Sequence, residues 1–200
     1  MRNRFLIIGT LVGTVVLFAW QTLSNAAIPW HMATMSEFAS DSAAAHAIRA
    51  AAPQNGTWFS KYGVLAAVAI TPDFADKTAG GAIVPMLTKQ LVLDLLVTLA
   101  AVALLLRLPS DGVVATGVTL SLGALAVGAV MQFSDWNWYG FGFSYALVNV
   151  IDQAIAFFIL GVTLAALRRR FGEPEEIRTA ERPGIRAQSG LPASGLGTKV

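Results

Sequence analysis

Four long apolar stretches dominate this chain and constrain its fold more than any other feature. They lie at about residues 5–23, 82–106, 112–132 and 144–167. A helix needs about 20 mostly apolar residues to cross the hydrocarbon core of a bilayer. Each stretch comes close to that length or exceeds it. The sequence therefore predicts an all-α membrane protein in which residues 1–170 form a bundle of four transmembrane helices.

The composition agrees with a membrane protein and excludes several other classes. Hydrophobic residues make up 55% of the chain and charged residues 13%, whereas soluble domains carry about 25% charged residues. A disordered protein would need low hydrophobicity and high charge. The absence of cysteine excludes disulfide scaffolds, thiol redox chemistry and iron–sulfur clusters. A net charge of +2 does not indicate a nucleic-acid partner.

The basic residues near the span ends predict the orientation. Arg2 and Arg4 precede the first span, Arg107 follows the second, and residues 168–170 close the fourth as three arginines. With four spans, all of them fall on one side of the membrane. Lys and Arg near span ends are enriched on the cytoplasmic side, so both termini are expected in the cytoplasm.

Residues 1–26 allow a second interpretation. A basic start, an apolar stretch and small residues around Asn25 also resemble a cleaved signal peptide. Against this, the apolar stretch is longer than a usual signal core and contains Trp20. Cleavage would leave three spans and an external N-terminus.

The segment between the first two spans, residues 24–81, is too long for a simple connection. It is predicted to form a small extracytoplasmic α+β cap. Residues 36–52 are rich in alanine and favour a short helix, while residues 57–60 and 64–70 favour a pair of strands. Residues 171–200 carry prolines, glycines and mixed charge, which predicts a disordered cytoplasmic tail.

Aromatic residues gather on the predicted outer side. The run from Asp135 to Phe141 has the sequence DWNWYGF and is interpreted as a turn at the outer interface. Trp and Tyr anchor helix ends at headgroup level. A docking surface for a partner is the alternative, because exposed aromatic residues are favoured at interfaces. The interface aromatic residues are predicted to be Trp30, Trp136, Trp138 and Tyr139.

Three ionisable residues fall inside the predicted spans, and each costs about 2.5–3.5 kcal/mol at the centre of a membrane helix. Lys89 and Asp94 are five residues apart on the second span, hence about 140° apart around the helix and poorly placed to pair. Asp152 lies on the fourth span between Asn149 and Gln153 at a depth similar to that of Lys89. We therefore expect an interhelical Lys89–Asp152 ion pair with the two amides nearby.

Asp94 is then left without a charged partner. A carboxyl group in hydrocarbon costs less when it is protonated, and a protonated Asp94 can donate to Ser121 or Thr119 on the third span. Three interpretations remain open for these polar residues. They can join helices to one another, form a proton or ion pathway, or contact a partner subunit inside the membrane.

Pairs of small residues spaced four apart predict close helix packing. They occur in the first, third and fourth spans: Gly9 and Gly13, Gly117 and Ser121, Ala124 and Gly128, and Gly161 and Ala165.

No known catalytic or cofactor motif is present. The chain has two histidines, His31 and His46, and both precede the second span, so a bis-histidine haem site within the bundle is excluded. A metal site formed with Glu37 and Asp41 matches no ligand spacing. No phosphate loop or dinucleotide fingerprint occurs. The sequence therefore predicts no metal, no cofactor and no catalytic residue.

The order of these features resembles a group of small bacterial inner-membrane proteins with four spans and no assigned activity. The matching pieces are the basic start, Ile28-Pro29-Trp30-His31 after Leu23, Ala51-Ala52-Pro53 before Gly56-Thr57-Trp58, and the aromatic run before the fourth span. They cover about residues 1–170. The resemblance implies a bacterial inner membrane and brings no catalytic residues.

The expected function is that of a non-catalytic accessory, assembly or scaffold subunit. The expected partners are the lipid bilayer and either another membrane protein or further copies of the chain, without nucleic acid. The alternative is a small oligomeric proton- or ion-coupled transporter or channel that uses Asp94, Lys89 and Asp152. An enzyme is the least supported class.

Overall fold

The computed structural model describes residues 2–68, 80–109 and 112–171. Four of its helices are long and apolar enough to cross a membrane: α1 (Arg2–Ala26), α3 (Gly80–Leu105), α4 (Val113–Tyr139) and α5 (Phe143–Phe171). They confirm the four helices predicted from the apolar stretches. Almost all of the predicted tail, from residue 172 onward, lies outside the described residues.

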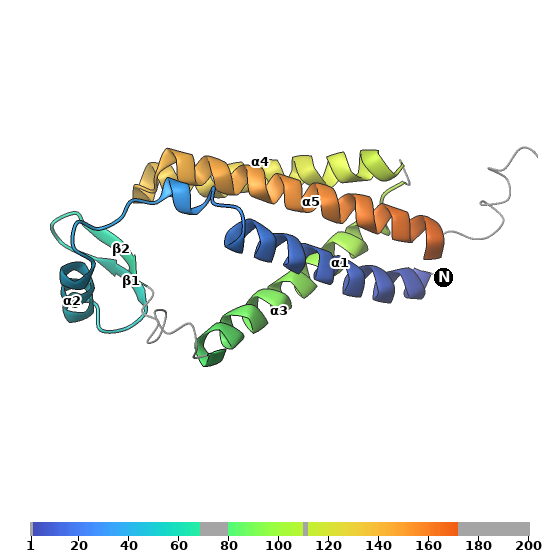
Figure 1. Ribbon diagram of the computed structural model, residues 1–200. Helices are drawn as coiled ribbons and strands as arrows, with labels where there is room; N and C mark the ends of the chain where they lie inside the picture. Colours follow the sequence, from blue (N-terminus) through green and yellow to red (C-terminus); the bar gives the residue numbers. More distant parts are fainter. Residues whose placement is uncertain (1, 69–79, 110–111, 172–200) are drawn as a thin grey trace, which may run out of the picture.

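The helices pack as an open row. α4 and α5 pack against each other as a hairpin, α5 packs on α1, and α1 packs on α3, which gives the order α3–α1–α5–α4. α3 and α4 lie at the two ends of this row and form no extensive contact with each other. Figure 1 shows α3 diverging from the α4–α5 hairpin toward its own N-terminal end. The bundle is therefore closed at one end of the helices and open at the other.

Small residues set the helix crossings, as the four-residue spacing predicted. A Cβ atom added to Gly161 of α5 would lie 2.7 Å from the Cα atom of Gly117 in α4. A Cβ atom on Gly13 of α1 would lie 2.6 Å from the side chain of Thr98 in α3. Side chains at these positions would push the helices apart, so the close approach depends on glycine.

The closed end holds the core. Its buried cluster, called the apolar cluster below, comprises Phe5, Ala101, Val102, Leu105, Leu120, Leu160 and Leu164. Elsewhere the helices expose long aliphatic side chains, such as Leu11, Leu122 and Val130. Less than half of each apolar helix is buried within the chain. Such continuous apolar surface is rare on soluble monomers and suits contact with lipid.

α1 starts at the end of the long helices that lies opposite the cap, and α5 ends there too (Figure 1). The arginine-rich turn at residues 168–170 lies at that end of α5. The start of α1 and the end of α5 therefore lie on the same side of the four long helices.

The segment after α1 forms the expected cap. It contains a single 3-10 turn η1 (Met32–Thr34), the helix α2 (Asp41–Ala51), and the strands β1 (Gly56–Phe59) and β2 (Leu65–Val68). The strands are antiparallel, with Gly56 opposite Val68 and Phe59 opposite Leu65. α2 begins later than the predicted start at residue 36, because the backbone is still extended at Ser40, its N-cap. The last two residues of the strand predicted at 64–70 lie outside the described residues.

The predicted turn at residues 135–141 is wrong for its first five residues. Asp135 to Tyr139 continue α4, and the helix ends at Gly140, whose φ of 73° is left-handed. Aromatic residues do not stop a helix, whereas glycine adopts the left-handed conformation at low cost. α4 therefore has 27 residues and a length of about 40 Å, beyond the ~30 Å of a bilayer core. The α4–α5 hairpin accordingly extends past the end of α1 toward the cap (Figure 1).

A polar site at the cap end of the helices

A cluster of five side chains joins the end of α1, the following segment and α5. Asp152 accepts a hydrogen bond from Trp20 Nε1 at 2.8 Å, and its other oxygen lies 3.2 Å from His31 Nε2. Ser24 Oγ accepts from Trp30 Nε1 at 3.0 Å and lies 3.3 Å from the same His31 nitrogen. Ser24 and His31 are buried. We call these residues the Asp152 cluster.

The local sequence explains why the chain folds back here. α1 ends at Ala26, and the next two backbone N–H groups both donate to the Leu23 carbonyl. Pro29 begins a tight turn and accepts from the N–H group of Ala33. This turn brings Trp30 and His31 back against α5, with their rings edge to face at 5.6 Å. The cluster therefore fastens the start of the cap to the helices.

The cluster contains the residue types of a Ser–His–Asp triad but not its geometry. A triad needs one imidazole nitrogen facing the serine and the other facing the carboxylate. Here Ser24 and Asp152 both approach Nε2 of His31. Ser24 is also fully buried, so its hydroxyl group is closed to a substrate. The arrangement links α1 and the segment that follows it to α5.

The expected Lys89–Asp152 ion pair is wrong. Asp152 is occupied by Trp20 and His31, while the Lys89 side chain is exposed and pairs with no described acidic residue. The reason is the helix order. α1 lies between α3 and α5, so it separates residues that lie at equal depth on α3 and α5.

Asp94 is joined to α1. Gln90 Nε2 donates to Gln21 Oε1 at 2.6 Å and to Asp94 Oδ1 at 2.9 Å. Asp94 is 1% exposed, and its Oδ2 has no hydrogen-bond partner among the described residues. A carboxyl group this deeply buried takes part in the packing of α3 on α1.

The expected hydrogen bond from Asp94 to Ser121 or Thr119 is also wrong. Ser121 Oγ donates to the Ala154 carbonyl on α5 at 2.8 Å. Both predicted partners lie on α4, which does not pack on α3. Ser121 thus supports the α4–α5 hairpin instead.

A polar pocket of about 240 Å³ lies where residues from all four long helices meet. We call it the amide pocket. Three of the predicted intramembrane residues line it, namely Asn149, Asp152 and Gln153. Lys89 does not line it, and Asp94 reaches it through Gln90. Its full lining is Gln21, Asn25, Gln90, Gln132, Asn149, Asp152, Gln153, Ala156 and Phe157.

The sequence analysis missed the amides on α1, α3 and α4, as well as the roles of Trp20, Ser24 and His31. Gln21, Gln90 and Gln132 each lie near the cap end of an apolar stretch. Polar amides at such positions were a usable signal, because intramembrane polar groups need partners. The only amides predicted from the sequence were Asn149 and Gln153, which flank Asp152 on the same span.

The polar contacts between α1 and α3 end at the apolar cluster. Below Asp94, Thr98 and Thr10 are buried with no described partner for their hydroxyl groups, and Thr14 donates to the Thr10 carbonyl. Farther along, Phe5 and Val102 are fully buried. The amide pocket therefore lies on the cap side of the apolar cluster, whose hydrocarbon side chains separate it from the arginine end.

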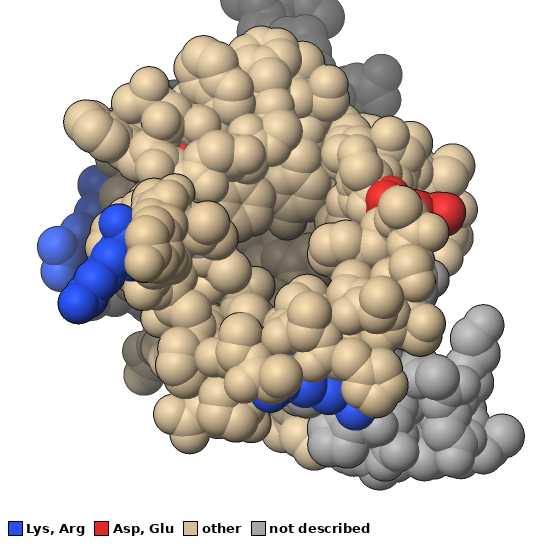
Figure 2. Space-filling model, turned by 90° about the vertical axis from the view of Figure 1, so that its left-hand side faces the viewer, with Lys and Arg blue, Asp and Glu red and all other residues tan. Residues whose placement is uncertain are grey.

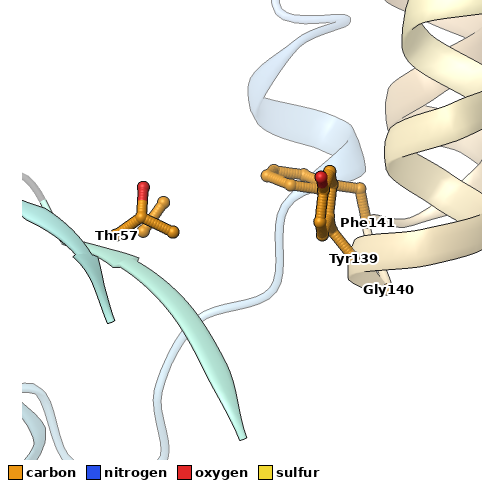
Figure 3. Close-up of a pocket in the computed structure, with 5 residues that line it drawn as sticks. Thr57, Tyr139, Gly140 and Phe141 are labelled. Atoms are coloured by element: carbon orange, nitrogen blue, oxygen red, sulfur yellow. The ribbon is translucent and has the colours of Figure 1, made fainter. Parts of the chain in front are cut away.

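A second opening lies between the cap and the tip of the α4–α5 hairpin. It has a volume of about 560 Å³ and is lined by Thr57 and Ala67 from the strands and by Tyr139, Gly140 and Phe141 from the tip. Figure 3 shows Thr57 facing Tyr139 and Phe141 across this space. We call it the cap gap.

Exposed aromatic residues gather at the hairpin tip, where Tyr139 and Phe141 line the cap gap and Trp136 and Trp138 precede them on α4. Trp138 is 76% exposed and Tyr139 is 56% exposed. Trp136 is partly exposed and packs edge to face on Phe143. Trp30, which the sequence assigned to the same interface, is only partly exposed and belongs to the Asp152 cluster. Figure 2, which looks onto this end, shows mostly uncharged surface around a central hollow, with charged residues toward the edges.

Within the part of the chain that the structure describes, no three His, Asp or Glu residues come together as a metal site. The chain matches no family model, and comparisons with curated proteins and with solved structures found no similar chain.

Proposed function

We propose that this chain is a multi-pass protein of a bacterial inner membrane and serves as a non-catalytic accessory, assembly or scaffold subunit. In this proposal both termini of the chain lie in the cytoplasm and the cap lies outside. The exposed aliphatic surfaces of the four helices support the membrane location. The arginines at the closed end support the orientation.

The observation that carries the proposal is the cap gap with its aromatic lining residues Tyr139 and Phe141. The cap elements α2, β1 and β2 form no extensive contact with the described helices. A lone two-stranded hairpin is marginally stable in water, and the described cap has little core of its own, with Ala52 as its buried apolar residue. Large aromatic side chains face solvent across the gap. Such surfaces are typical of protein interfaces, in which Trp and Tyr are enriched.

The partner that fits this gap is an extracytoplasmic protein segment that presents apolar side chains. It would cover Trp138, Tyr139 and Phe141 from above and pack against the strands below. A second copy of this chain is the alternative occupant, since the same surface is present on every copy.

The test is purification of the tagged protein in a gentle detergent, with mass spectrometry of the proteins that accompany it. We expect a stoichiometric partner with the native chain. A Trp138→Ala, Tyr139→Ala double variant should lose that partner, because truncation of central aromatic residues removes much of the binding energy. The matched control is Leu122→Ala, Val130→Ala on the exposed lipid-facing side of α4, which should retain it.

Each result decides between the proposals. Loss of the partner from the double variant alone supports the accessory function and identifies the process. A homo-oligomer that the double variant disrupts assigns the surface to self-association. A monomer with no accompanying protein would contradict the accessory function.

Transport is the second candidate, and the amide pocket is the observation that favours it. The apolar cluster opposes it, because the polar side chains of the α1–α3 contact end there. An Asp94→Asn variant tests this candidate by proton flux into proteoliposomes. Wild-type flux that falls at least tenfold in the variant would favour transport, whereas no flux above that of empty vesicles would exclude proton transport by this chain alone.

A further inference from the structure

The amide pocket lies in the open part of the helical row. Gln90 of α3 and Gln132 of α4 line it together with residues of α1 and α5. α3 and α4 form no extensive contact with each other. The pocket therefore opens sideways between them, in the direction that faces lipid if the helices span a membrane.

The depth of the pocket matches the edge of the hydrocarbon. The α1 candidate span runs from Asn3 to Ala26, about 36 Å of helix for a core of ~30 Å. Gln21 and Asn25 occupy its last two turns on the cap side. The indoles of Trp20 and Trp30 lie in the adjoining Asp152 cluster, and Trp side chains favour headgroup level. A lipid headgroup at this depth would reach the pocket.

The chemistry of the lining selects the headgroup. Six carboxamides and one carboxylate line the pocket, and none of the lining residues that the structure describes is Lys or Arg. A carboxylate can accept about four hydrogen bonds, and Asp152 receives a contact from only one described residue on each oxygen. Asp94 lies directly behind Gln90. The Asp152 carboxylate in the lining, the Asp94 carboxyl group behind Gln90, and amide oxygens that can accept hydrogen bonds favour a cation that carries N–H donors.

Beyond the amide pocket, toward the middle of α3 and α4, the side chains on the same helix faces are apolar. Val97 lies seven residues beyond Gln90 on the same face of α3, and Leu125 lies seven residues from Gln132 on the same face of α4. Both side chains are exposed. Lys89, next to Gln90, is exposed with no described acidic partner, and its long side chain can place the ammonium group at headgroup level.

We propose that the amide pocket binds the headgroup of a phospholipid that carries a primary ammonium group, with its acyl chains along the open side between α3 and α4. The ammonium group donates to Asp152 and to the oxygens of Asn149 and Gln153. Lys89 pairs with the phosphate group. The inference rests on the membrane location proposed above and is independent of the partner at the cap gap.

The test is native mass spectrometry of the full-length protein in detergent, titrated with phosphatidylethanolamine and phosphatidylcholine of identical acyl chains. The two headgroups differ in that the trimethylated ammonium of phosphatidylcholine has no N–H donor. We expect one tightly bound phosphatidylethanolamine and an apparent affinity about tenfold or more above that for phosphatidylcholine. Equal affinities, or a preference for phosphatidylcholine or phosphatidylglycerol, would overturn the proposal.

An Asn149→Leu, Gln153→Leu variant should bring the two affinities to within about twofold of each other, since it removes acceptors for the N–H groups. The matched control is Asn3→Leu, an amide at the opposite end of the helices, which should keep the selectivity. A double variant that keeps the wild-type ratio would contradict the site. Should that variant not fold, the competition between lipids on the native chain decides alone.

Failure of this proposal can be told apart from failure of the proposed membrane location. A chain that alkaline extraction releases from membranes contradicts the membrane location. A chain that stays in membranes but binds both lipids equally contradicts the lipid site alone.

Discussion

The arginine end and the cap end of the long helices differ in how their side chains pack. At the arginine end, Phe5, Val102 and Leu164 are fully buried against one another, and the helices are close. At the cap end, α3 diverges from the α4–α5 hairpin (Figure 1), and six side-chain amides and one carboxylate line the pocket between the helices. Apolar packing therefore holds the helices together at one end, whereas polar side chains gather between them at the other.

The difference follows from where the small residues lie. Gly13, Gly117 and Gly161 let backbones approach closely in the middle and at the arginine end. Toward the cap end the residue on α5 that faces Gly128 is Gln153, whose amide oxygen would lie 2.5 Å from an added Cβ atom. There a polar side chain, rather than a second glycine, fills the space between α4 and α5. Within one hairpin, a contact of glycine with glycine gives way to a contact of glycine with a polar side chain.

The largest expected effect comes from breaking the tightly packed end. Gly161→Leu should lower the free energy of unfolding in detergent by about 3 kcal/mol or more, because the new side chain meets the backbone of α4 rather than a flexible side chain. Thermal unfolding followed by circular dichroism measures this. Gly123→Leu is the control on the same hairpin, since a Cβ atom there meets nothing within 4 Å. Similar losses for the two variants would show that the helix crossing is not where the structure places it.

A smaller effect is expected at the Asp152 cluster. Asp152→Ala leaves the partly buried Trp20 indole N–H and the buried His31 ring without their carboxylate partner and should cost about 1–3 kcal/mol of unfolding free energy. A double-mutant cycle with Trp20→Phe should show coupling between the two positions. Strict additivity would mean that the Trp20–Asp152 hydrogen bond does not form.

The smallest effect is expected at Lys89. Because its side chain is exposed and forms no ion pair with a described residue, Lys89→Gln should change the unfolding free energy by less than about 0.5 kcal/mol. The same denaturation experiment measures it beside Asp152→Ala. A loss of unfolding free energy as large as that of Asp152→Ala would instead support the Lys89–Asp152 ion pair expected from the sequence. In the lipid titration, Lys89→Gln should weaken both phospholipids alike and leave their ratio unchanged.

The sequence predicted the elements well because their signals are local. Apolar length found α1, α3, α4 and α5, and small-residue spacing found the crossing at Gly117 and Gly161. The end of α4 was misplaced because aromatic residues are equally compatible with a helix and with an interfacial turn. Gly140 carried the correct signal, since it ends the helix with a left-handed backbone.

The candidate site was predicted only in part. Asn149, Asp152 and Gln153 were recognised because polar groups in apolar helices are costly. Their partners were not, because equal depth along two helices says nothing about which helix lies between them. The fold-back at Pro29, which brings His31 to Asp152, joins residues far apart in the chain. Residue spacing within one helix could not reveal that contact.

By itself the sequence determined how many long apolar helices form, where the cap is inserted and which residues carry polar groups, because each depends on neighbouring residues along one segment. Only the tertiary structure decided the order α3–α1–α5–α4, the pairing of Asp152 with Trp20 and His31, and the convergence of amides from four helices on one pocket. Those features depend on which helix faces end up together. That choice is made by the packing of all four helices at once, through contacts between residues distant in the chain.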